Sequence, residues 1–379
     1  MNVELTYQAR LAEYLHIAPE QVSLYWKGRV ALYTVLKAMG VGPGDEVILP
    51  AFTCVVVPNA ILYLGAIPIY VDINPDTLCC DAAQIERALS PKTKVILIQN
   101  MLGLSVEVSE IITLAKAHGI YTIEDCTHGF GGKHQGVFNG LRSDASFFSS
   151  QWNKPFSTGI GGMLVVNNRD LLQPVNQLNS HLIKPSAKDQ FILFILIWAR
   201  TYLLKGFTYW TFLRMYRWLS KKGLVVGSSS ASELEGIHMP KDYVKGMSKV
   251  QCRAGIKALS TLDQVISQRK KSGISVHEWL TSQGKTTVPA EHLAQHAFLK
   301  YPILVKDRAL FLQHAEKVPL GDWFISPLHP VLDSLEPWGL DVSNFPNAVY
   351  ISKHIVNLPL DLPVHRLINF LELYKNEII

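Results

Sequence analysis

Short apolar segments alternate with segments of helical spacing between residues 29 and 170, and this alternation restricts the chain to few folds. The expected strands cover residues 46–49, 68–71, 95–98, 121–123, 147–148 and 163–166, and the expected helices cover 29–39, 59–64, 82–89 and 108–117. Apolar strands separated by helices are typical of a parallel sheet that is buried on both faces. The sequence therefore predicts an α/β domain with a mostly parallel sheet between two layers of helices.

The rest of the chain follows a different pattern. A long helix over residues 248–272, a strand over 298–305 and a final helix over 364–375 are typical of a small α+β domain. Because 379 residues are enough for two cores, we predict a large domain over residues 1–183 and a small domain over 241–379. Between them, residues 184–240 are expected to form a basic, aromatic helical insertion followed by a serine-rich linker.

Composition excludes several classes of protein. An apolar content of 48% with 18% charged residues is that of a folded chain with much buried surface. A net charge of +5 without an Arg/Lys tract argues against a nucleic-acid partner. The five cysteines contain no Cys-x-x-Cys pair, so we predict neither a metal site nor a disulfide framework. With no apolar leader at the N-terminus, the expected compartment is the reducing cytoplasm.

Polar residues that can carry chemistry follow the expected strands. Asn100 follows one strand and Asp125 the next, and ligand sites in such sheets form where loops leave the strand ends. A further strand leads to Ser149, and Lys154 follows five residues later in a loop bounded by Gly159. These positions are therefore the first candidates for a ligand site.

A lysine, a carboxylate and a hydroxyl are the parts that a pyridoxal phosphate (PLP) enzyme needs. Lys154 would form an imine with the aldehyde of the cofactor, since burial and the cofactor itself lower the pKa of a lysine. Asp125 would keep the pyridine nitrogen protonated, and Ser149 would bind the phosphate. Glu124 stands next to Asp125, and strand alternation sends the two carboxylates to opposite faces. The sequence leaves open which of them is the functional acid.

Two further segments fit the same cofactor. His128 stands three residues beyond Asp125, and it could hydrogen-bond the ring oxygen, lie against the ring or only fill space. Gly28 opens a helix whose free N–H groups and dipole can hold a phosphate. Arg29 could add positive charge there or could face solvent.

These residues lie in motifs that resemble the sugar aminotransferases of the DegT/StrS family, which belong to fold type I of the PLP-dependent enzymes. The matching segments are residues 28–32, 42–53, 65–73, 124–125, 149–162, 250–256 and 357–360. Their order and spacing make the match far more specific than any single motif. The resemblance implies a PLP-dependent transferase of fold type I, with a seven-stranded, mostly parallel sheet in the large domain and a smaller α+β C-terminal domain.

The resemblance also implies an activity and its partners. The implied cofactor-binding residues are Gly28, Arg29, Cys54, Asn100, Asp125, His128, Ser149 and Lys154, of which Lys154 and Asp125 are catalytic. The protein would be a homodimer whose active sites lie at the subunit interface. An amino donor, typically glutamate, would leave its amino group on the cofactor, which would pass it to a keto sugar, usually nucleotide-linked, in polysaccharide or glycoside synthesis. Lys154, once released, would move the proton between cofactor and substrate.

Some positions depart from the pattern of the family. Cys54 stands where an aromatic side chain often stacks on the cofactor, so the ring would lose that surface unless His128 or another residue covers it. A small-domain asparagine that commonly reaches the phosphate of the partner subunit is missing from residues 243–247, where Lys245 could take its place. Relatives with dehydratase activity carry histidine instead of the lysine, and Lys154 argues against that branch.

Residues 184–222 are the least family-like segment. They contain eight Lys or Arg residues and one acid, with ten of the 37 aromatic residues of the chain. The apolar runs are too short and too often interrupted for a membrane span. Cations and Trp/Tyr residues around apolar runs are typical of a helix that lies on a membrane surface, which would place a peripheral contact at the inner face of the membrane. A helical hairpin packed on the dimer explains the same pattern, and the sequence leaves both hypotheses open.

The preferred functional hypothesis is thus a PLP-dependent aminotransferase that acts on a keto sugar. Another PLP reaction, such as dehydration or epimerisation, is a first alternative. A catalytically silent relative that serves as a membrane-associated scaffold or regulator is a second, and it rests on Cys54 and on the insertion.

Overall fold

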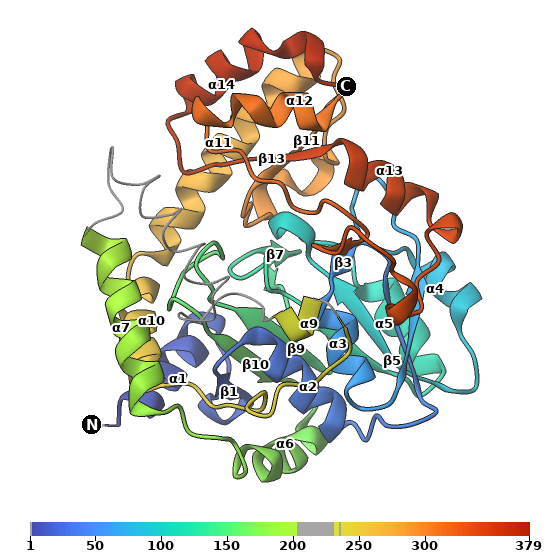
Figure 1. The fold of residues 1–379 in the computed structure, drawn as a ribbon, viewed down its shortest axis with the longest axis vertical. Helices are drawn as coiled ribbons and strands as arrows, with labels where there is room; N and C mark the ends of the chain where they lie inside the picture. Colours follow the sequence, from blue (N-terminus) through green and yellow to red (C-terminus); the bar gives the residue numbers. More distant parts are fainter. Residues whose placement is uncertain (1, 203–230, 235) are drawn as a thin grey trace.

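The computed structural model describes residues 2–202, 231–234 and 236–379 (Figure 1). In this part of the chain the main sheet has seven strands, in the spatial order β1 (Val22–Tyr25), β10 (Gly162–Val166), β9 (Ala145–Ser149), β6 (Tyr121–Asp125), β5 (Thr93–Gln99), β2 (Glu46–Pro50) and β4 (Ile67–Val71). The strands from β9 to β4 are parallel, and β10 and β1 continue the sheet in antiparallel pairs at one edge. The mostly parallel seven-stranded sheet is therefore confirmed.

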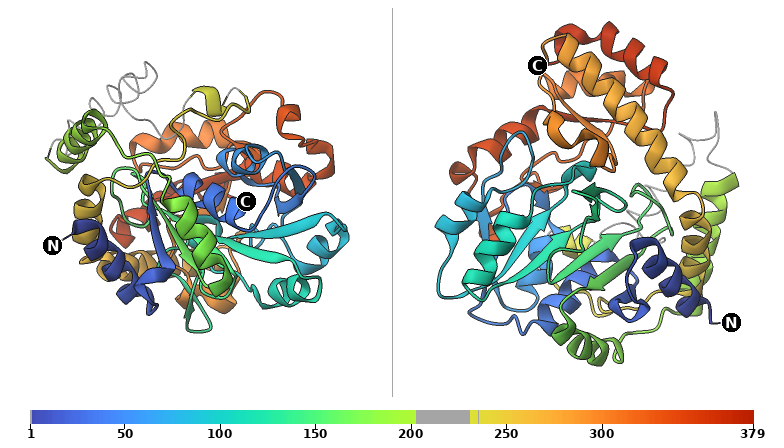
Figure 2. Two further views of the ribbon diagram at one scale, coloured as in Figure 1. Left: turned by 90° about the horizontal axis from the view of Figure 1, so that it is seen from below. Right: turned by 180° about the vertical axis from the view of Figure 1, so that it is seen from behind.

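Helices cover both faces of this sheet, because the apolar side chains of its central strands alternate between the faces. Val47 and Leu49 of β2 belong to a core that includes side chains of α2 (Gly28–Ala38) and α3 (Val56–Leu62). Ile48 lies on the opposite face, in a cluster with side chains of α4 (Ala82–Ala88) and α5 (Ser109–Ala117). On the first face, α6 (Leu172–Asn179) packs beside α2. The two layers of helices are visible from below and from behind (Figure 2).

The C-terminal elements gather at the opposite end of the molecule from α6 (Figure 1). They are the antiparallel strands β11 (Tyr301–Leu304) and β13 (Ile355–Leu358) and the helices α11 (Leu262–Ser282), α12 (Arg308–Phe311), α13 (Pro346–His354) and α14 (Val364–Leu373). The strand expected over residues 298–305 begins later, because Phe298 has a φ of +46° and the backbone of Leu299 bonds to Leu102 instead.

Two helices replace the single helix expected over residues 248–272. The first, α10 (Lys249–Leu259), ends where the hydroxyls of Ser260 and Thr261 bond back to preceding carbonyls, and α11 then begins at a new angle (Figure 2). Helix α10 packs on the N-terminal helix α1 (Val3–Leu15), where a Cβ on Gly255 would come within 2.3 Å of the Tyr7 ring. The start of the chain and the segment beyond the insertion therefore share one apolar cluster.

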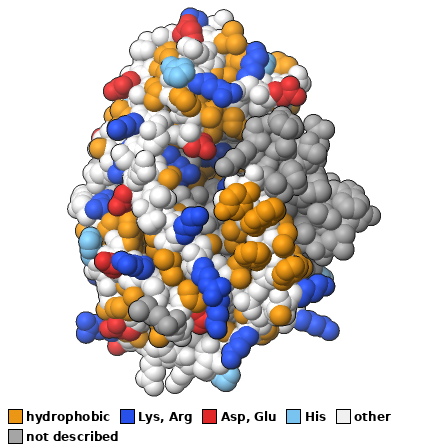
Figure 3. All heavy atoms as spheres, turned by 90° about the vertical axis from the view of Figure 1, so that its left-hand side faces the viewer, with side chains coloured by type: hydrophobic (Ala, Val, Ile, Leu, Met, Phe, Trp, Pro, Cys, Tyr) orange, Lys and Arg blue, Asp and Glu red, His pale blue; other side chains and the backbone are white. Residues whose placement is uncertain are grey.

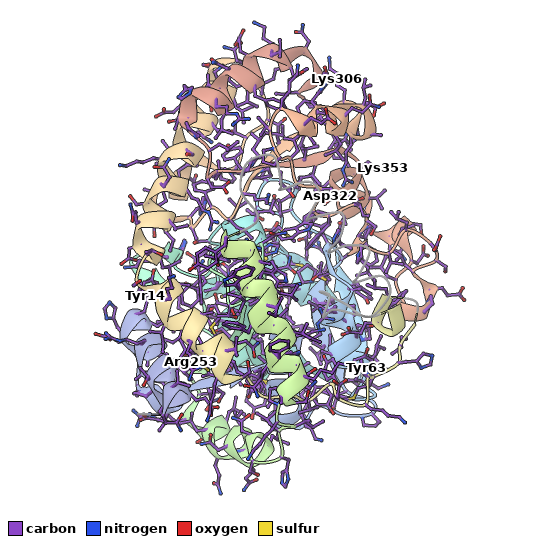
Figure 4. The ribbon with its side chains drawn as sticks, turned by 60° about the vertical axis from the view of Figure 1, so that its left-hand side comes forward. Tyr14, Tyr63, Arg253, Lys306, Asp322 and Lys353 are labelled. Carbon is purple, nitrogen blue, oxygen red and sulfur yellow. The ribbon has the colours of Figure 1, made fainter. Side chains whose placement is uncertain are left out.

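The described part of the insertion is helical, as expected. Helix α7 (Ala187–Tyr202) buries Leu193 against Trp26 and Ile160 and lies beside α10, which carries Arg253 (Figure 4). Residues 203–230 contain the remainder of the basic aromatic segment and most of the serine-rich linker, and these expectations lie outside the described residues. Of the helices that are described, none is both long enough and apolar enough to cross a membrane.

Short elements complete the region around the sheet ends. They are the parallel pair β3 (Thr53–Cys54) and β12 (Leu328–His329), the hairpin β7 (Lys133–His134) and β8 (Val137–Phe138), and the one-turn helix α9 (Ala231–Leu234). The β3–β12 pair joins a loop of the large sheet to the C-terminal part of the chain. It brings the segment around residues 323–329 next to the ends of the parallel strands.

Candidate active site

Strand β6 ends in two carboxylates that have different surroundings. Glu124 is almost fully buried, and it accepts hydrogen bonds from the Gly140 N–H (2.9 Å) and from the Ser143 hydroxyl (3.0 Å). Burial raises the pKa of Glu124, and these hydrogen bonds oppose the rise. The carboxylate of Glu124 therefore ties β6 to the loop before β9.

Asp125 lies on the other face of β6. Its Oδ1 accepts the Thr127 N–H at 2.9 Å, and its side chain is buried. Burial raises the pKa of Asp125, while the Thr127 hydrogen bonds and the charge of Lys154 act in the opposite direction. Asp125 is thus the carboxylate of this pair that interacts with Lys154, which answers the question that the sequence left open about their faces.

Lys154 lies in the loop that follows β9. The loop is closed by Ser150 and Thr158, whose hydroxyls are 2.7 Å apart and whose backbones bond at 2.8 Å. Burial lowers the pKa of Lys154 from its ordinary value of 10.5 to about 8, although Asp125 and Cys54 oppose this shift. The amine is therefore neutral, and so nucleophilic, in a much larger fraction of molecules than an exposed lysine would be.

This lowered pKa predicts how the reactivity of Lys154 depends on pH. Only the unprotonated amine attacks an aldehyde, and lowering the pKa moves the rise of that form to lower pH. We expect the rate at which PLP attaches to PLP-free protein to rise with pH with a midpoint of about 8. Stopped-flow absorbance from about pH 6 to 11 measures that rate, with Lys154→Ala as the blank. A midpoint near the ordinary value of 10.5 would contradict the lowered pKa.

The start of α2 lies against the ends of β9 and β10. A Cβ on Gly28 would come within 3.0 Å of the Phe148 carbonyl oxygen and within 3.3 Å of the Ser149 Cβ. A Cβ on Gly162 would come within 2.4 Å of the Gly28 nitrogen. Glycine at these two positions lets the strands approach the helix, and the side chain of the N-cap residue, Lys27, makes no capping hydrogen bond. Ser149 and the N-terminus of α2 therefore lie together, in an arrangement that can bind an anion.

Arg29 is buried in an ion pair with Glu233, which the sequence did not indicate. Asn59 holds Glu233 in place by donating its side-chain N–H to the Glu233 carbonyl oxygen at 2.8 Å. Burial disfavours the charge of Arg29, but the Glu233 carboxylate outweighs this effect and raises the pKa of Arg29. Burial, together with Arg29, lowers the pKa of neighbouring Lys27 to about 8. The Arg29 charge is therefore compensated within the chain.

His128 has a defined hydrogen-bonding state. The Leu102 N–H donates to His128 Nδ1 at 3.1 Å, so in the neutral ring the proton resides on Nε2. Burial, followed by the charge of Lys154, lowers the pKa of His128 well below its ordinary range. His128 is therefore a neutral side chain whose Nε2–H can donate a hydrogen bond.

Cys54 lies at the end of β3, and Asn100 directly follows β5 of the main sheet. Cys54 stands opposite His329 in the β3–β12 pair, and burial raises the pKa of its thiol. The Asn100 side chain donates to Glu124 Oε2 at 3.4 Å, so it belongs to the hydrogen-bond network of Glu124. Its Oδ1 accepts no hydrogen bond from the residues that the structure describes.

Lys245, which could have replaced the missing asparagine, is engaged within its own chain. Its Nζ lies 2.6 Å from Asp242 Oδ2 and 3.2 Å from Asp189 Oδ2, and the residue is buried. These bonds connect α7 to the segment before α10. They do not support a role for Lys245 at the phosphate of a partner subunit.

The segment from Trp323 to His329 also reaches the site, and sequence analysis did not predict it. The Trp323 ring lies parallel to His128 with centroids 5.3 Å apart, and Lys154 Nζ is 5.0 Å from the Trp323 centroid. Phe324 stacks on His329, and burial lowers the pKa of His329 to about 4. Nothing in the local sequence pattern connects these residues to Lys154, because contacts between distant parts of the chain, such as the β3–β12 pair, bring them there.

Comparisons with known proteins agree with this arrangement. The family model described as DegT/DnrJ/EryC1/StrS aminotransferase family matches residues 4–196, just over half of the chain. A GDP-perosamine synthase of Escherichia coli O157:H7 is 38% identical over 165 residues, which span 44% of this chain and 45% of that protein, less than half of either. The spore coat polysaccharide biosynthesis protein SpsC of Bacillus subtilis strain 168 is 26% identical over 339 residues, or 87% of this chain and 78% of that protein. The structure of NtdA from Bacillus subtilis, solved with bound PMP cofactor, superposes with a TM-score of 0.72 at 22% identity and covers all of this chain and 78% of that one.

The sheet, with its lysine and aspartate at the parallel strand ends, defines a protein with the fold of the type I PLP-dependent enzymes. Within that class, the chain belongs to the DegT/DnrJ/EryC1/StrS aminotransferase family.

Proposed function

We propose that the protein is a PLP-dependent aminotransferase that moves an amino group from glutamate onto a nucleotide-linked keto sugar in polysaccharide or glycoside synthesis. The observation that carries this proposal is the charge interaction between the partly buried Lys154 and the buried carboxylate of Asp125, together with a lysine pKa that is lowered to about 8. The names of the two curated relatives, a GDP-perosamine synthase and a polysaccharide biosynthesis protein, support the substrate class.

The described side chains fit PLP in number and in chemical type. Lys154 supplies a partly neutral amine, and Asp125 supplies a buried carboxylate that can hold a proton on a ring nitrogen. The Nε2–H of His128 can donate to a ring oxygen. Ser149 and the uncapped start of α2 would hold the phosphate. When bound, PLP supplies an aldehyde carbon and an electron-withdrawing ring.

The residues of the chain then have distinct tasks in the proposed reaction. Lys154 would hold the cofactor covalently, and its amine, when free, could accept a proton from one carbon and return a proton to another. Asp125 would keep the ring nitrogen protonated, because a buried carboxylate pairs strongly with a cation. The neutral state of His128 avoids a second positive charge beside Lys154.

Incubation with glutamate and a panel of nucleotide-linked keto sugars, followed by mass analysis, tests this function. We expect 2-oxoglutarate and one aminated sugar nucleotide, and neither product from Lys154→Ala protein. Formation of 2-oxoglutarate without an aminated sugar would reject nucleotide-linked keto sugars as the substrate but would support glutamate as the amino donor. Dehydrated or epimerised sugar without 2-oxoglutarate would indicate the alternative PLP reactions.

We also propose the assembly and location that the family resemblance implies. These are a homodimer with shared active sites, a cytoplasmic protein, and a chain divided into domains at residues 183 and 240. Sedimentation equilibrium tests the dimer.

We further propose that the insertion contacts the inner face of the membrane. One face of α7 exposes a stripe of large apolar side chains, which are Phe191, Phe194, Ile195, Trp198 and Tyr202. The side of the molecule that carries α7 faces the viewer in Figure 3, where apolar side chains gather in a patch with Lys and Arg around it. Residues 184–222 carry eight Lys or Arg residues and one acid, Asp189, so the net positive charge of this segment would attract anionic lipids.

Vesicle flotation provides the corresponding prediction. We expect the protein to float with anionic vesicles at low salt and to lose this binding in the double variant Phe194→Glu, Trp198→Glu, because two carboxylates would enter the apolar stripe. Leu332→Glu is the matched control, since Leu332 is 72% exposed but lies far from α7 in the sequence.

The opposite outcomes are equally clear. Equal flotation of the wild type and the double variant would reject membrane contact through α7. A double variant that becomes monomeric would show instead that α7 packs in the dimer.

A further inference from the structure

We propose that Trp323 is a substrate-binding residue of this enzyme and that its indole stacks on the sugar ring of the substrate. This inference rests on the proposed function. Trp323 comes from the C-terminal part of the chain, and the loop around Asp322 lies between the C-terminal helices and the sheet (Figure 4).

The position of the Trp323 ring points to the reacting end of the site. Lys154 Nζ lies 5.0 Å from the ring centroid, and the ring is parallel to His128 within 7°. Lys154 is the residue that would bond to the aldehyde carbon, and His128 is the residue that would contact the ring oxygen. The indole is therefore next to the atoms between which the amino group is transferred, where the substrate must lie.

The Trp323 backbone is held in place by a buried asparagine. Trp323 N–H donates to Asn357 Oδ1 at 2.9 Å, and Asn357 Nδ2 donates to the Trp323 carbonyl oxygen at 2.7 Å. Asn357 is fully buried on β13, and its own backbone exchanges two hydrogen bonds with Gly321 (2.8 and 3.0 Å). Asn357 thus acts as a positioning residue, and the sequence motif 357–360 acquires a structural role.

Neighbouring residues leave the Trp323 ring usable by a ligand. Trp323 itself is only partly buried, whereas Phe324 is buried against Phe52 and fixes the segment. The C–H face of a pyranose is flat and apolar, so it packs well on an indole, and its hydroxyls remain free at the rim.

Paired ligands separate sugar binding from nucleotide binding. Calorimetry on PLP-loaded protein would compare UDP-glucose with UDP, dTDP-glucose with dTDP, and GDP-mannose with GDP. In each pair, the ratio of the two affinities measures what the sugar adds to binding. We expect Trp323→Ala to reduce this ratio by about tenfold and to bind the nucleotide alone as the wild type does. Trp323→Phe should restore most of the ratio. Trp198→Ala on α7 is the control and should behave as wild type.

Three results would overturn the proposal. If the sugar adds as much affinity in Trp323→Ala as in the wild type, Trp323 does not stack on the sugar. Equal weakening of both members of a pair would indicate only a structural role. A weakened PLP absorbance band in Trp323→Ala would show that Trp323 binds the cofactor instead.

A second measurement does not depend on which sugar binds. PLP at Lys154 should quench the emission of a tryptophan 5.0 Å away, so Trp323→Phe should lose a much larger share of the PLP-dependent quenching than Trp198→Phe. Equal losses in the two variants would place Trp323 away from the reacting atoms and overturn the inference. If no sugar nucleotide binds the wild type, the keto-sugar function fails, while the quenching result still decides the position of Trp323.

Discussion

Lys154→Ala is expected to abolish transamination, with kcat lower by about 10⁴-fold or more, and to yield protein without the absorbance band of a lysine-bound PLP. The substitution removes both the covalent attachment of the cofactor and the proton carrier between substrate and cofactor. Steady-state assays with glutamate measure the first effect, and absorbance spectra of the purified protein measure the second.

Lys154→Arg is the matched control for this prediction. Arginine keeps a cation beside Asp125 but remains protonated at all accessible pH values, so it should be as inactive as alanine. Both variants should unfold at nearly the wild-type temperature when no PLP is present. Lys154 lies in a loop and forms no salt bridge with any residue that the structure describes, so its substitution removes none. Activity within tenfold of wild type in either variant would remove Lys154 from the catalytic role.

Asp125→Asn is expected to reduce kcat by about 10³-fold while leaving the protein folded. A neutral amide cannot stabilise the protonated ring nitrogen, and the electron-withdrawing capacity of the ring is lost with that proton. Asparagine still accepts the Thr127 N–H bond that Asp125 makes, so the local structure should persist. Activity assays and thermal unfolding of the same preparation measure both effects.

Glu124→Gln tests whether the neighbouring carboxylate, and not Asp125, is the functional acid. Glu124 is bonded to Gly140 and Ser143, so its substitution should lower the free energy of unfolding by about 1–3 kcal/mol and leave kcat within a few-fold of wild type. The reverse pattern, with an inactive Glu124→Gln and an active Asp125→Asn, would reassign the functional acid.

The alternation of apolar strands and helices was enough to predict the parallel sheet. Each central strand is buried on both faces, as Ile48 shows between Val47 and Leu49, so the signal is local and strong. The helix ends were predicted less accurately. The single helix expected over residues 248–272 is divided into α10 and α11 at Ser260, because side-chain hydroxyls compete there with the helical hydrogen bonds.

The polar residues at the strand ends were also identified from sequence, and the structure gathers most of them. Lys154 and Asp125 interact, and Ser149 lies against Gly28 at the start of α2. Asn100 is at the expected strand end, but its amide bonds to Glu124, because a side chain at such a position can point to either face of the sheet.

The sequence by itself determined the sheet, the order of its strand-end residues, and Lys154 with two candidate carboxylates, because these depend on periodicity and on motifs a few residues long. Only the tertiary structure decided that Asp125 rather than Glu124 interacts with Lys154, that Glu233 compensates Arg29, and that Asn357 holds Trp323 at the site. Glu233 follows Arg29 by 204 positions. Contacts over such separations arise from packing of the whole chain, so no local pattern of residues encodes them.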